Sequence, residues 1–459
     1  MREALDVDVV VIGTGQAAPS LAVALASRGE KVALVEGALL GGSCVNSGCT
    51  PTKTLRKSAR VAYLARRAAE FGVQVSGVEV DFAAAMQRMQ TLVDGSRADL
   101  GKWIDAQPNI TLVRGWAAFT GRSDRGFELL AGDQPLRAQR VYLNTGTRAF
   151  MPPIPGLDAV PALDNVSLLQ LRTLPAHLVI LGGSYIGLEM GQIFRRLGSA
   201  VTVVEPGPRI TSREDEDVSA AIAGFLGDEG IGLIVGHPVE RVERSGDGVA
   251  VHVGGQRIGG SHLLVATGRL PNTERLRLDV VGVSTDEGGF VPTDGRLETN
   301  VPGIWALGDI NKRGAFTHTS YQDHQIVLAN HEGGARTADG RVATYAMYTD
   351  PPLGRVGLTE AQARRSDRPM LAVNWPMASV SRVREEGETS GLIKLLVDAQ
   401  SERIVGAAVL GLNGDEVIQV ISNFMATGAS YRVLRDALPI HPTVGEFLPF
   451  VLGKLRPLQ

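Results

Sequence analysis

The sequence predicts an α/β protein in which two Rossmann-type units precede a C-terminal α+β domain. Three observations predict this fold. A glycine-rich strand–turn–helix pattern begins at residue 7, the same pattern begins again at residue 177, and the segments after residue 338 resemble antiparallel strands separated by helices.

Composition narrows the classes of protein to which the chain can belong. Of its 459 residues, 44% are hydrophobic and 21% are charged, which suits a sizeable core in roughly two to four domains. The formal net charge of −3 gives no reason to expect a nucleic-acid or membrane-surface partner. No apolar run reaches the ~18 residues of a membrane span, and no signal-peptide pattern opens the chain, so we expect a cytoplasmic protein.

The first glycine-rich pattern has the features of a dinucleotide-binding fingerprint. Residues 7–12 predict a buried parallel strand, and a turn with Gly13 and Gly15 leads into an apolar helix. The first glycine permits the tight turn, and the second lets a pyrophosphate approach the backbone N–H groups at the helix N-terminus. The next strand ends at Glu36, where a carboxylate can bind ribose hydroxyls.

The second pattern repeats these features. Gly182, Ser184 and Gly187 occupy the glycine positions, and the following strand ends at Glu205. Two such units predict two bound dinucleotides, and the alternative is that one unit has lost its ligand. Glu205 favours NADH because a carboxylate repels a 2′-phosphate, although Arg209 could still bind a phosphate in NADPH.

Small-residue turns close each unit. The first unit ends in a strand followed by Thr145 and Gly146, and the second in a strand followed by Thr267 and Gly268. Asp309 comes directly after a later apolar strand, where a short acidic residue is well placed to bind a ribityl or pyrophosphate group.

The two cysteines of the chain lie five positions apart, in GGSCVNSGCTPTK at residues 41–53. We expect Cys44 in a loop and Cys49 near the N-terminus of a helix that Pro51 helps to start, where the macrodipole favours a thiolate. Lys53 lies one helical turn after Cys49, on the same face. A redox pair, a metal pair, a structural disulfide and two buried thiols are the alternatives; we favour the redox pair and expect no metal site, because no further Cys or His cluster is nearby.

A candidate base lies near the C-terminus. His441 opens the segment HPTVGE, and Glu446, the last residue of that segment, can orient its imidazole. Thiol exchange needs a base to move a proton between sulfur atoms. We expect His318 and His324 to be structural, and the acidic run SREDEDVSAA to be a solvated helix start.

Six motifs in order resemble those of the flavoprotein (pyridine nucleotide) disulfide oxidoreductases, the family of glutathione reductase, dihydrolipoamide dehydrogenase and mercuric reductase. They are the first fingerprint, the cysteine motif, the second fingerprint, ATG, GD and HPTVGE. VNSGCTPTK is most similar to the mercuric-reductase-like branch, yet this chain lacks the C-terminal cysteine pair of that branch.

The resemblance implies two cofactors and four domain segments. FAD would be held by Gly13, Gly15, Glu36, Gly42, Ser43, Lys53, Thr145, Gly146 and Asp309. NADH or NADPH would be held by Gly182, Gly187, Glu205 and Gly268. The segments expected are FAD-binding at 1–148 and 269–338, NAD(P)-binding at 149–268, and dimerisation at 339–459.

The resemblance also implies catalytic roles. Cys49 would be the thiolate at the flavin, and Cys44 the thiol that exchanges with substrate. Further roles would belong to Lys53 paired with Glu189, to Tyr185 as a gate that moves when nicotinamide stacks on the flavin, and to His441 with Glu446. In the family this histidine reaches the cysteines of the other subunit, which implies a homodimer.

Three functions stay open from the sequence. The first is NAD(P)H-dependent reduction of a small disulfide, or the reverse oxidation of a dithiol. The second is reduction of a metal ion such as mercury, or of another acceptor that is not a disulfide. The third is a flavoprotein scaffold or complex subunit whose redox site is idle.

Overall fold

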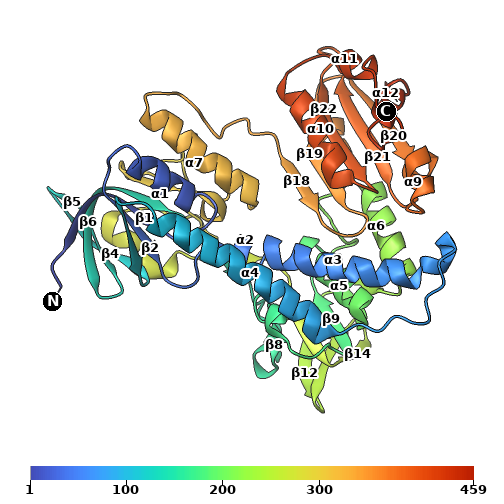
Figure 1. The fold of residues 1–459 in the computed structure, drawn as a ribbon, viewed down its shortest axis with the longest axis horizontal. Helices are drawn as coiled ribbons and strands as arrows, with labels where there is room; N and C mark the ends of the chain where they lie inside the picture. The colour runs from blue at the N-terminus through green and yellow to red at the C-terminus, as the bar shows by residue number, and fades with distance from the viewer. Residues whose placement is uncertain (1, 459) are drawn as a thin grey trace. The chain divides into compact units, whose positions relative to one another are not determined.

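A computed structural model describes residues 2–458 (Figure 1). The chain divides into two compact units. The first contains the described residues up to Leu55 together with Ala83–Met151 and Gly268–Arg341. The second contains Arg56–Phe82, Pro152–Thr267 and the described residues from Val342 onward. Among the residues that the structure describes, no helix is long and apolar enough to cross a membrane.

A seven-stranded sheet forms the centre of the first unit, with the order β3-β2-β1-β6-β5-β4 and with β17 paired to β6. Its parallel strands are β1 (Leu5–Ile12), β2 (Val32–Glu36), β3 (Ile110–Arg114), β6 (Gln134–Leu143) and β17 (Ile304–Ala306). The antiparallel strands β4 (Ala117–Ser123) and β5 (Gly126–Ala131) extend it. A separate pair consists of β7 (Thr147–Ala149) and β16 (Arg269–Pro271).

The first unit also contains helices, the first of which contacts β1, β2 and β3. They are α1 (Ala18–Ala26), α2 (Gly42–Asn46), the start of α3 (Cys49–Arg66), α4 (Phe82–Asp105) and α7 (Thr317–His331), and α1 packs against α7. Alternate residues of β1 belong to two different cores: Val9 and Val11 to one, Val10 and Ile12 to the other. A strand buried on both faces explains why its sequence is a continuous apolar run.

The second unit contains a second parallel sheet and a C-terminal antiparallel sheet. The parallel sheet has the order β11-β10-β9-β15-β8. Its strands are β8 (Ala162–Leu163), β9 (His177–Leu181), β10 (Ala200–Glu205), β11 (Gly232–Val235) and β15 (His262–Val265). The associated elements are the helices α5 (Tyr185–Leu197) and α6 (Glu216–Asp228) and the strands β12 (Val239–Ser245), β13 (Gly248–Val253) and β14 (Gln256–Gly260).

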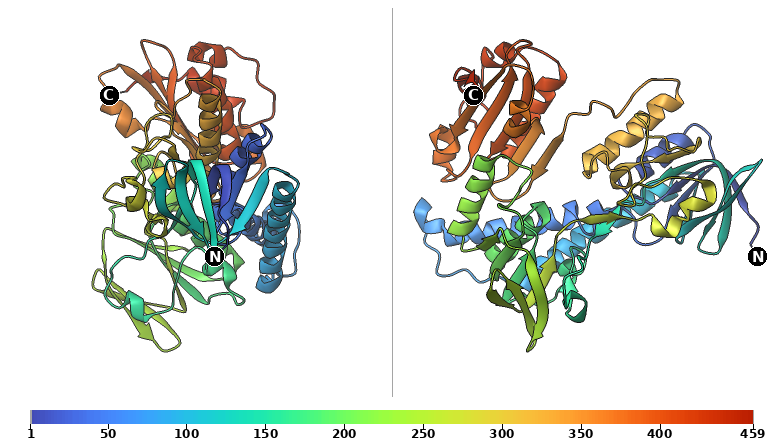
Figure 2. Two further views of the ribbon diagram at one scale, coloured as in Figure 1. Left: turned by 90° about the vertical axis from the view of Figure 1, so that its left-hand side faces the viewer. Right: turned by 180° about the vertical axis from the view of Figure 1, so that it is seen from behind.

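The C-terminal sheet has six strands in the order β18-β19-β22-β21-β20-β23. They are β18 (Thr344–Met347), β19 (Leu353–Gly357), β20 (Met370–Pro376), β21 (Leu392–Asp398), β22 (Ile404–Leu410) and β23 (Arg456–Pro457). Its helices are α8 (Glu360–Arg364), α9 (Ser381–Glu385), α10 (Gly414–Ala426), α11 (Tyr431–Arg435) and α12 (Phe447–Leu452). Helix α10 lies against this sheet, as two further views show (Figure 2).

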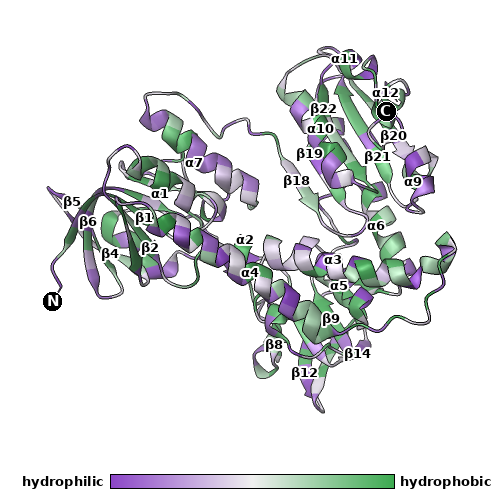
Figure 3. Cartoon of the chain, viewed as in Figure 1, coloured by the Kyte–Doolittle hydropathy of each residue, from purple (hydrophilic) through white to green (hydrophobic). Residues whose placement is uncertain are grey.

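Short 3-10 helices lie between these elements, at Ala68–Phe71, Leu157–Ala159, Leu168–Gln170, Glu274–Leu276, Leu278–Val281, Gly308–Asn311 and Met377–Ser379. Strands β1 and β2 of the first sheet and β21 and β22 of the C-terminal sheet are coloured largely as hydrophobic (Figure 3).

The predicted α/β fold is confirmed, with two parallel sheets followed by an antiparallel one. Three of the five boundaries between the compact units fall close to residues 148, 268 and 338, which the sequence marks as domain limits, while the other two fall after Leu55 and after Phe82. The second unit nevertheless combines the second parallel sheet with the C-terminal sheet, so the four-part division stays a prediction.

Candidate active site

The parallel strands of the first unit bring the predicted FAD-binding residues to one sheet edge. In the register of the sheet, Ile12 at the end of β1 pairs with Val35 and Leu143, and Leu143 pairs with Ala306. The turns that follow these strand ends carry five predicted residues, namely Gly13, Gly15, Thr145, Gly146 and Asp309. The sixth, Glu36, is itself the last residue of β2. Ligands of open α/β sheets bind at this carboxyl edge.

Position 13, the first of the turn after β1, admits only glycine. Gly13 has φ +95°, and a Cβ there would collide with the carbonyl oxygen of Asn144. A Cβ at Gly15 would lie 2.7 Å from Asn144 Oδ1. Glu36 completes the turn, because its carboxylate accepts hydrogen bonds from the backbone N–H groups of Thr14 at 3.0 Å and Ala38 at 2.8 Å.

Asp309 lies at the same edge, in the 3-10 helix that follows β17. Thr147 Oγ1 donates a hydrogen bond to its carboxylate at 3.0 Å. Burial raises the pKa of Asp309 above its usual value, although the charge of Arg269 opposes the shift. Buried Asp323 accepts the N–H of Gly308 at 2.8 Å and so fixes the start of this turn.

These residues fit a flavin dinucleotide. Gly42 approaches Gly15 so closely that a Cβ on Gly42 would lie 2.9 Å from the Gly15 Cα atom, which gives a cradle with bare backbone on both sides. The start of α1 supplies N–H groups for a pyrophosphate, and Glu36 and Asp309 supply acceptors for hydroxyl groups. When bound, FAD supplies the two-electron chemistry that connects a nicotinamide cofactor to a disulfide.

The two cysteines lie in consecutive helices beside this cradle. Cys49 is the first residue of α3, as expected from Pro51. Cys44 lies in the short helix α2, so the predicted loop position is wrong. Gly41 and Gly42, with φ +98° and +61°, turn the chain tightly enough for one helical turn to form between them and Cys49.

The two cysteines are not joined in a disulfide, and Cys44 is half-buried while Cys49 is exposed. A hydrogen bond between the two side chains, with burial as the second cause, raises the pKa of the Cys44 thiol far above its usual value. Cys49 Sγ lies 3.2 Å from Oγ1 of Thr317, the first residue of α7. Sequence reasoning missed Thr317, which lies 268 residues after Cys49 in the chain.

The second fingerprint reproduces the first turn in the second unit. Gly182 has φ +109°, and a Cβ there would collide with the carbonyl oxygen of Ala266. Glu205 accepts the N–H groups of Gly183 and Gly207, both at 2.8 Å.

The remaining residues of the second fingerprint lie on both sides of a unit boundary. Gly187 in α5 lies against the Gly182 carbonyl, and Ser184 is the N-cap of α5. Gly268, expected with this group, instead belongs to the first unit, where its carbonyl accepts the N–H of Phe150 at 2.9 Å.

Tyr185 and Glu189 lie in the first turns of α5. Tyr185 donates a hydrogen bond to Glu214 at 3.1 Å, and the backbone N–H of Tyr348 donates to Glu189 at 2.7 Å. Lys53 belongs to the first unit and Glu189 to the second, so their pairing stays a prediction.

The C-terminal histidine pairs with the expected acid. His441 Nδ1 lies 2.9 Å from Glu446 Oε2, while the His441 side chain is 75% exposed. In this contact Glu446 fixes one side of the imidazole, and the exposed side of the ring is open to a proton donor or acceptor, while the catalytic role of the pair stays a prediction.

Two other expectations concerned side chains outside the site. His324 is buried, and burial lowers its pKa, while His318 stacks on Phe316. The acidic run is not a solvated helix start throughout, because Glu214 and Asp215 are buried. Their charges are compensated by basic residues of the C-terminal sheet.

Comparison with known proteins decides the family. Residues 7–324 match the family described as pyridine nucleotide-disulphide oxidoreductase, and residues 343–449 match its dimerisation domain. The chain belongs to this family. It is therefore an oxidoreductase of the class that uses FAD and NAD(P)H, and the resemblance noted in its motifs is confirmed.

Relatives whose names indicate different activities are similar to this chain to about the same degree. The probable pyridine nucleotide-disulfide oxidoreductase RclA of Escherichia coli is 36% identical, over 96% of this chain and 97% of RclA. A mercuric reductase of Staphylococcus aureus is 33% identical, over 96% of this chain and 81% of that enzyme. A dihydrolipoyl dehydrogenase of Chlamydia muridarum is 31% identical, over 97% and 96%.

A solved structure agrees with these relatives. The Cu(II) complex of the HOCl-induced flavoprotein disulfide reductase RclA from Escherichia coli aligns with a TM-score of 0.89 at 35% identity. The alignment covers 97% of this chain and 99% of that one.

Proposed function

We propose that this oxidoreductase reduces a small disulfide with electrons from NAD(P)H, or oxidises a dithiol in reverse, and that Cys44 and Cys49 are its redox pair. The observation that carries the proposal is the placement of Cys44 in α2 and of Cys49 at the start of the next helix, α3, beside the FAD-type cradle. Two thiols so placed can close into a disulfide and reopen.

The proposed exchange balances atoms and electrons. NAD(P)H and one proton supply two electrons, which open the Cys44–Cys49 disulfide to two thiols. The Cys44 thiolate attacks one sulfur of the substrate disulfide and releases the first thiol. Cys49 then attacks Cys44, which releases the second thiol and restores the disulfide.

We propose distinct tasks for the residues around this pair. Thr317 donates its hydroxyl to the Cys49 sulfur and holds it at the start of α3, where the helix dipole favours a thiolate. His441, oriented by Glu446, carries the proton between Cys44 and the leaving thiol.

A homodimer follows as part of the proposal. The chain carries the dimerisation domain of its family, and residues 339–459 would form the interface. In this arrangement each active site takes its cysteines from one subunit and its histidine from the other. A cytoplasmic location, the four domain segments and the pairing of Lys53 with Glu189 belong to the same proposal.

Reduction of a metal ion is the second candidate. It is supported by the mercuric reductases among the relatives and by the Cu(II) complex of RclA. The cysteine count opposes mercury as substrate, since both cysteines belong to the proposed redox pair and none is left to hand a metal ion inward.

A substrate panel tests the proposal on the purified FAD-loaded enzyme. NAD(P)H oxidation is followed with glutathione disulfide, lipoamide, cystine, Hg²⁺ or Cu²⁺ as acceptor. We expect disulfide turnover that Cys44→Ser abolishes, while flavin content and flavin bleaching by NAD(P)H persist. Lys57→Gln, on the exposed side of α3, is the matched control and should keep full turnover.

Three results would contradict this proposal or favour another function. Disulfide turnover that survives in Cys44→Ser would reject the role of this thiol. Turnover with metal ions alone would favour the second candidate. An enzyme that bleaches with NAD(P)H and turns over no acceptor would support an idle scaffold.

A further inference from the structure

The start of α6 carries an acidic run whose members have different surroundings. Glu216 is 88% exposed at its side chain, whereas Glu214 and Asp215 are buried. Burying a carboxylate costs free energy unless charged and hydrogen-bonded partners compensate it. The partners of Glu214 therefore indicate what this residue does.

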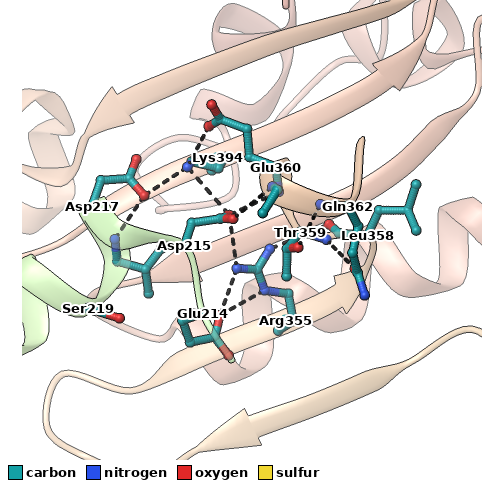
Figure 4. Close-up of polar contacts among 12 residues, drawn as sticks. Glu214, Asp215, Asp217, Ser219, Arg355, Leu358, Thr359, Glu360, Gln362 and Lys394 are labelled. Atoms are coloured by element: carbon teal, nitrogen blue, oxygen red, sulfur yellow. Dashed lines mark hydrogen bonds and ion pairs between the residues drawn. The ribbon is translucent and has the colours of Figure 1, made fainter. Parts of the chain in front are cut away.

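Four hydrogen bonds saturate the Glu214 carboxylate. Tyr185 Oη and Tyr345 Oη both donate to Oε1, at 3.1 and 2.6 Å. Arg355 donates to Oε2 from Nε at 3.0 Å and from Nη2 at 2.7 Å (Figure 4). A carboxylate offers about four acceptor positions, so this one has no capacity left.

The C-terminal sheet holds Glu214 in place. Arg355 lies in β19 with its side chain only 1% exposed, and it also contacts Asp215 at 3.2 Å. Lys394 in β21 lies 2.8 Å from Asp217 and 3.5 Å from Asp215, which fixes the start of α6 to the same sheet (Figure 4).

The two phenols that share Oε1 come from different places. Tyr345 lies in β18 of the C-terminal sheet, while Tyr185 is the first residue of α5, directly after the second dinucleotide turn. Their rings lie 5.5 Å apart. Burial and the neighbouring charge of Glu214 raise the pKa of both, to about 12 for Tyr345, so both hydroxyls remain donors at neutral pH.

We propose that Glu214 is a positioning residue that holds Tyr185 across the place of the nicotinamide ring, and that Tyr345 competes with Tyr185 for the same oxygen. The inference rests on the proposed NAD(P)H-dependent function and on the gate role that the family resemblance implies for Tyr185, which moves aside to admit that ring. This movement breaks the Tyr185 hydrogen bond and leaves the buried charge to Tyr345 and Arg355. The Tyr185–Glu214 hydrogen bond therefore opposes nicotinamide binding. Tyr345 competes for the same oxygen, weakens this bond and so favours nicotinamide binding.

Two variants of the same kind should have opposite effects. Tyr185→Phe keeps the ring and removes the bond, so the Kd of the preferred coenzyme should fall about tenfold. Tyr345→Phe leaves Tyr185 as the single donor to Oε1, so the Kd should rise. Asp228→Asn, which changes an exposed carboxylate at the end of α6, is the matched control and should leave the Kd unchanged.

Isothermal titration calorimetry on the oxidised, FAD-loaded enzyme measures these constants with NAD⁺ and NADP⁺. ADP-ribose serves as a second probe, because it lacks nicotinamide and should bind every variant with the same affinity. Glu214→Gln keeps the side-chain shape and removes the charge, so it should lower the Kd, and combining it with Tyr185→Phe should lower the Kd no further.

The outcomes separate this inference from the proposed function. A Kd of Tyr185→Phe equal to that of the wild type would overturn the role of Glu214. A shift of both phenylalanine variants in one direction, or a changed ADP-ribose affinity, would show a structural disturbance and overturn it too. If Tyr345→Phe does not fold, the Glu214→Gln and double-variant values decide. A wild-type enzyme that binds neither NAD⁺ nor NADP⁺ would overturn the proposed function itself.

Discussion

The two dinucleotide turns share one construction but differ in what surrounds them. In each, a glycine at positive φ lies against a backbone carbonyl, and a strand-end glutamate accepts backbone N–H groups. The first turn is also closed by Thr14, whose Oγ1 accepts the N–H of Gly41 at 3.0 Å. The second turn is followed by Tyr185, which one hydrogen bond holds to Glu214.

This difference matches the two kinds of ligand that the family uses. A flavin stays bound through many turnovers, so a turn that is fixed by hydrogen bonds to its own residues suits it. A nicotinamide coenzyme must arrive and leave in every cycle. A side chain that is held through its terminal hydroxyl, against an ionic frame, can move without disturbing the turn itself.

Replacing the first glycine of each turn should have the largest effect. Gly13→Ala should abolish FAD binding, and Gly182→Ala should abolish nicotinamide coenzyme binding while the protein stays yellow, because each new Cβ collides with a carbonyl oxygen. The flavin-to-protein absorbance ratio and calorimetry with NAD⁺ and NADP⁺ measure the two outcomes.

A matched control separates collision from backbone strain. Gly29 has φ +88° but nothing lies within 4 Å of its Cβ position, so Gly29→Ala should cost only about 1–2 kcal/mol of stability and keep both ligands. Loss of FAD from Gly182→Ala would show that the two turns are not independent.

Removing the buried cation that faces Glu214 should have the next largest effect. Arg355→Met leaves Glu214 and Asp215 without their shared partner, and we expect the free energy of unfolding to fall by about 3–5 kcal/mol. Urea denaturation followed by circular dichroism measures it. Arg364→Met breaks a more exposed pair with Glu360 in α8 and should change stability by less than about 1 kcal/mol. Equal decreases in the free energy of unfolding for the two variants would mean that burial of the ion pair does not determine how much stability its removal costs.

The pH dependence of stability should differ in sign between the units, and this effect is the smallest. The folded pKa of Asp309 is raised by burial, so the folded state binds more protons than the unfolded state, and stability falls as pH rises from 3.8 towards the raised pKa. Burial also opposes ionisation of Asp215, but Arg355 and two backbone N–H groups lower its pKa overall. Asp215 therefore stabilises the fold above its usual pKa, and that stability is lost as pH falls through the lowered value.

Asparagine variants test these signs. Asp309→Asn should make the flavin-free protein more stable near neutral pH and weaken FAD binding, whereas Asp215→Asn should destabilise it at the same pH. Urea midpoints between pH 4 and pH 7 for both variants and the wild type give the comparison. A loss of stability in flavin-free Asp309→Asn would contradict a buried, disfavoured carboxylate at this position.

The sequence predicts those parts of the site that depend on neighbours in the chain. Glycine spacing marks both turns because the steric demand is local, and Pro51 marks the start of the helix that begins at Cys49. The pairing of His441 with Glu446 spans five residues and was expected for the same reason.

Contacts between distant segments escape this kind of reasoning. Arg355 lies 141 residues after Glu214, and Thr317 lies 268 residues after Cys49. Nothing in the run SREDEDVSAA shows that cations of a later sheet will bury two of its carboxylates, so its charge favours solvent. Cys44 differs for a local reason, because the two glycines before it allow either a loop or a helical turn.

The position of β17 has a consequence for how the protein is made on the ribosome. Val141 of β6 pairs with Ile304 of β17, and Asp309 follows that strand, so the first sheet lacks one parallel strand until the whole segment Pro152–Thr267 has been synthesised. That intervening segment is continuous in the chain and carries its own parallel sheet, so it can fold before the first unit is complete. The emerging flavin-binding half therefore depends on its later residues, and a chain that is truncated before Ile304 should accumulate without flavin.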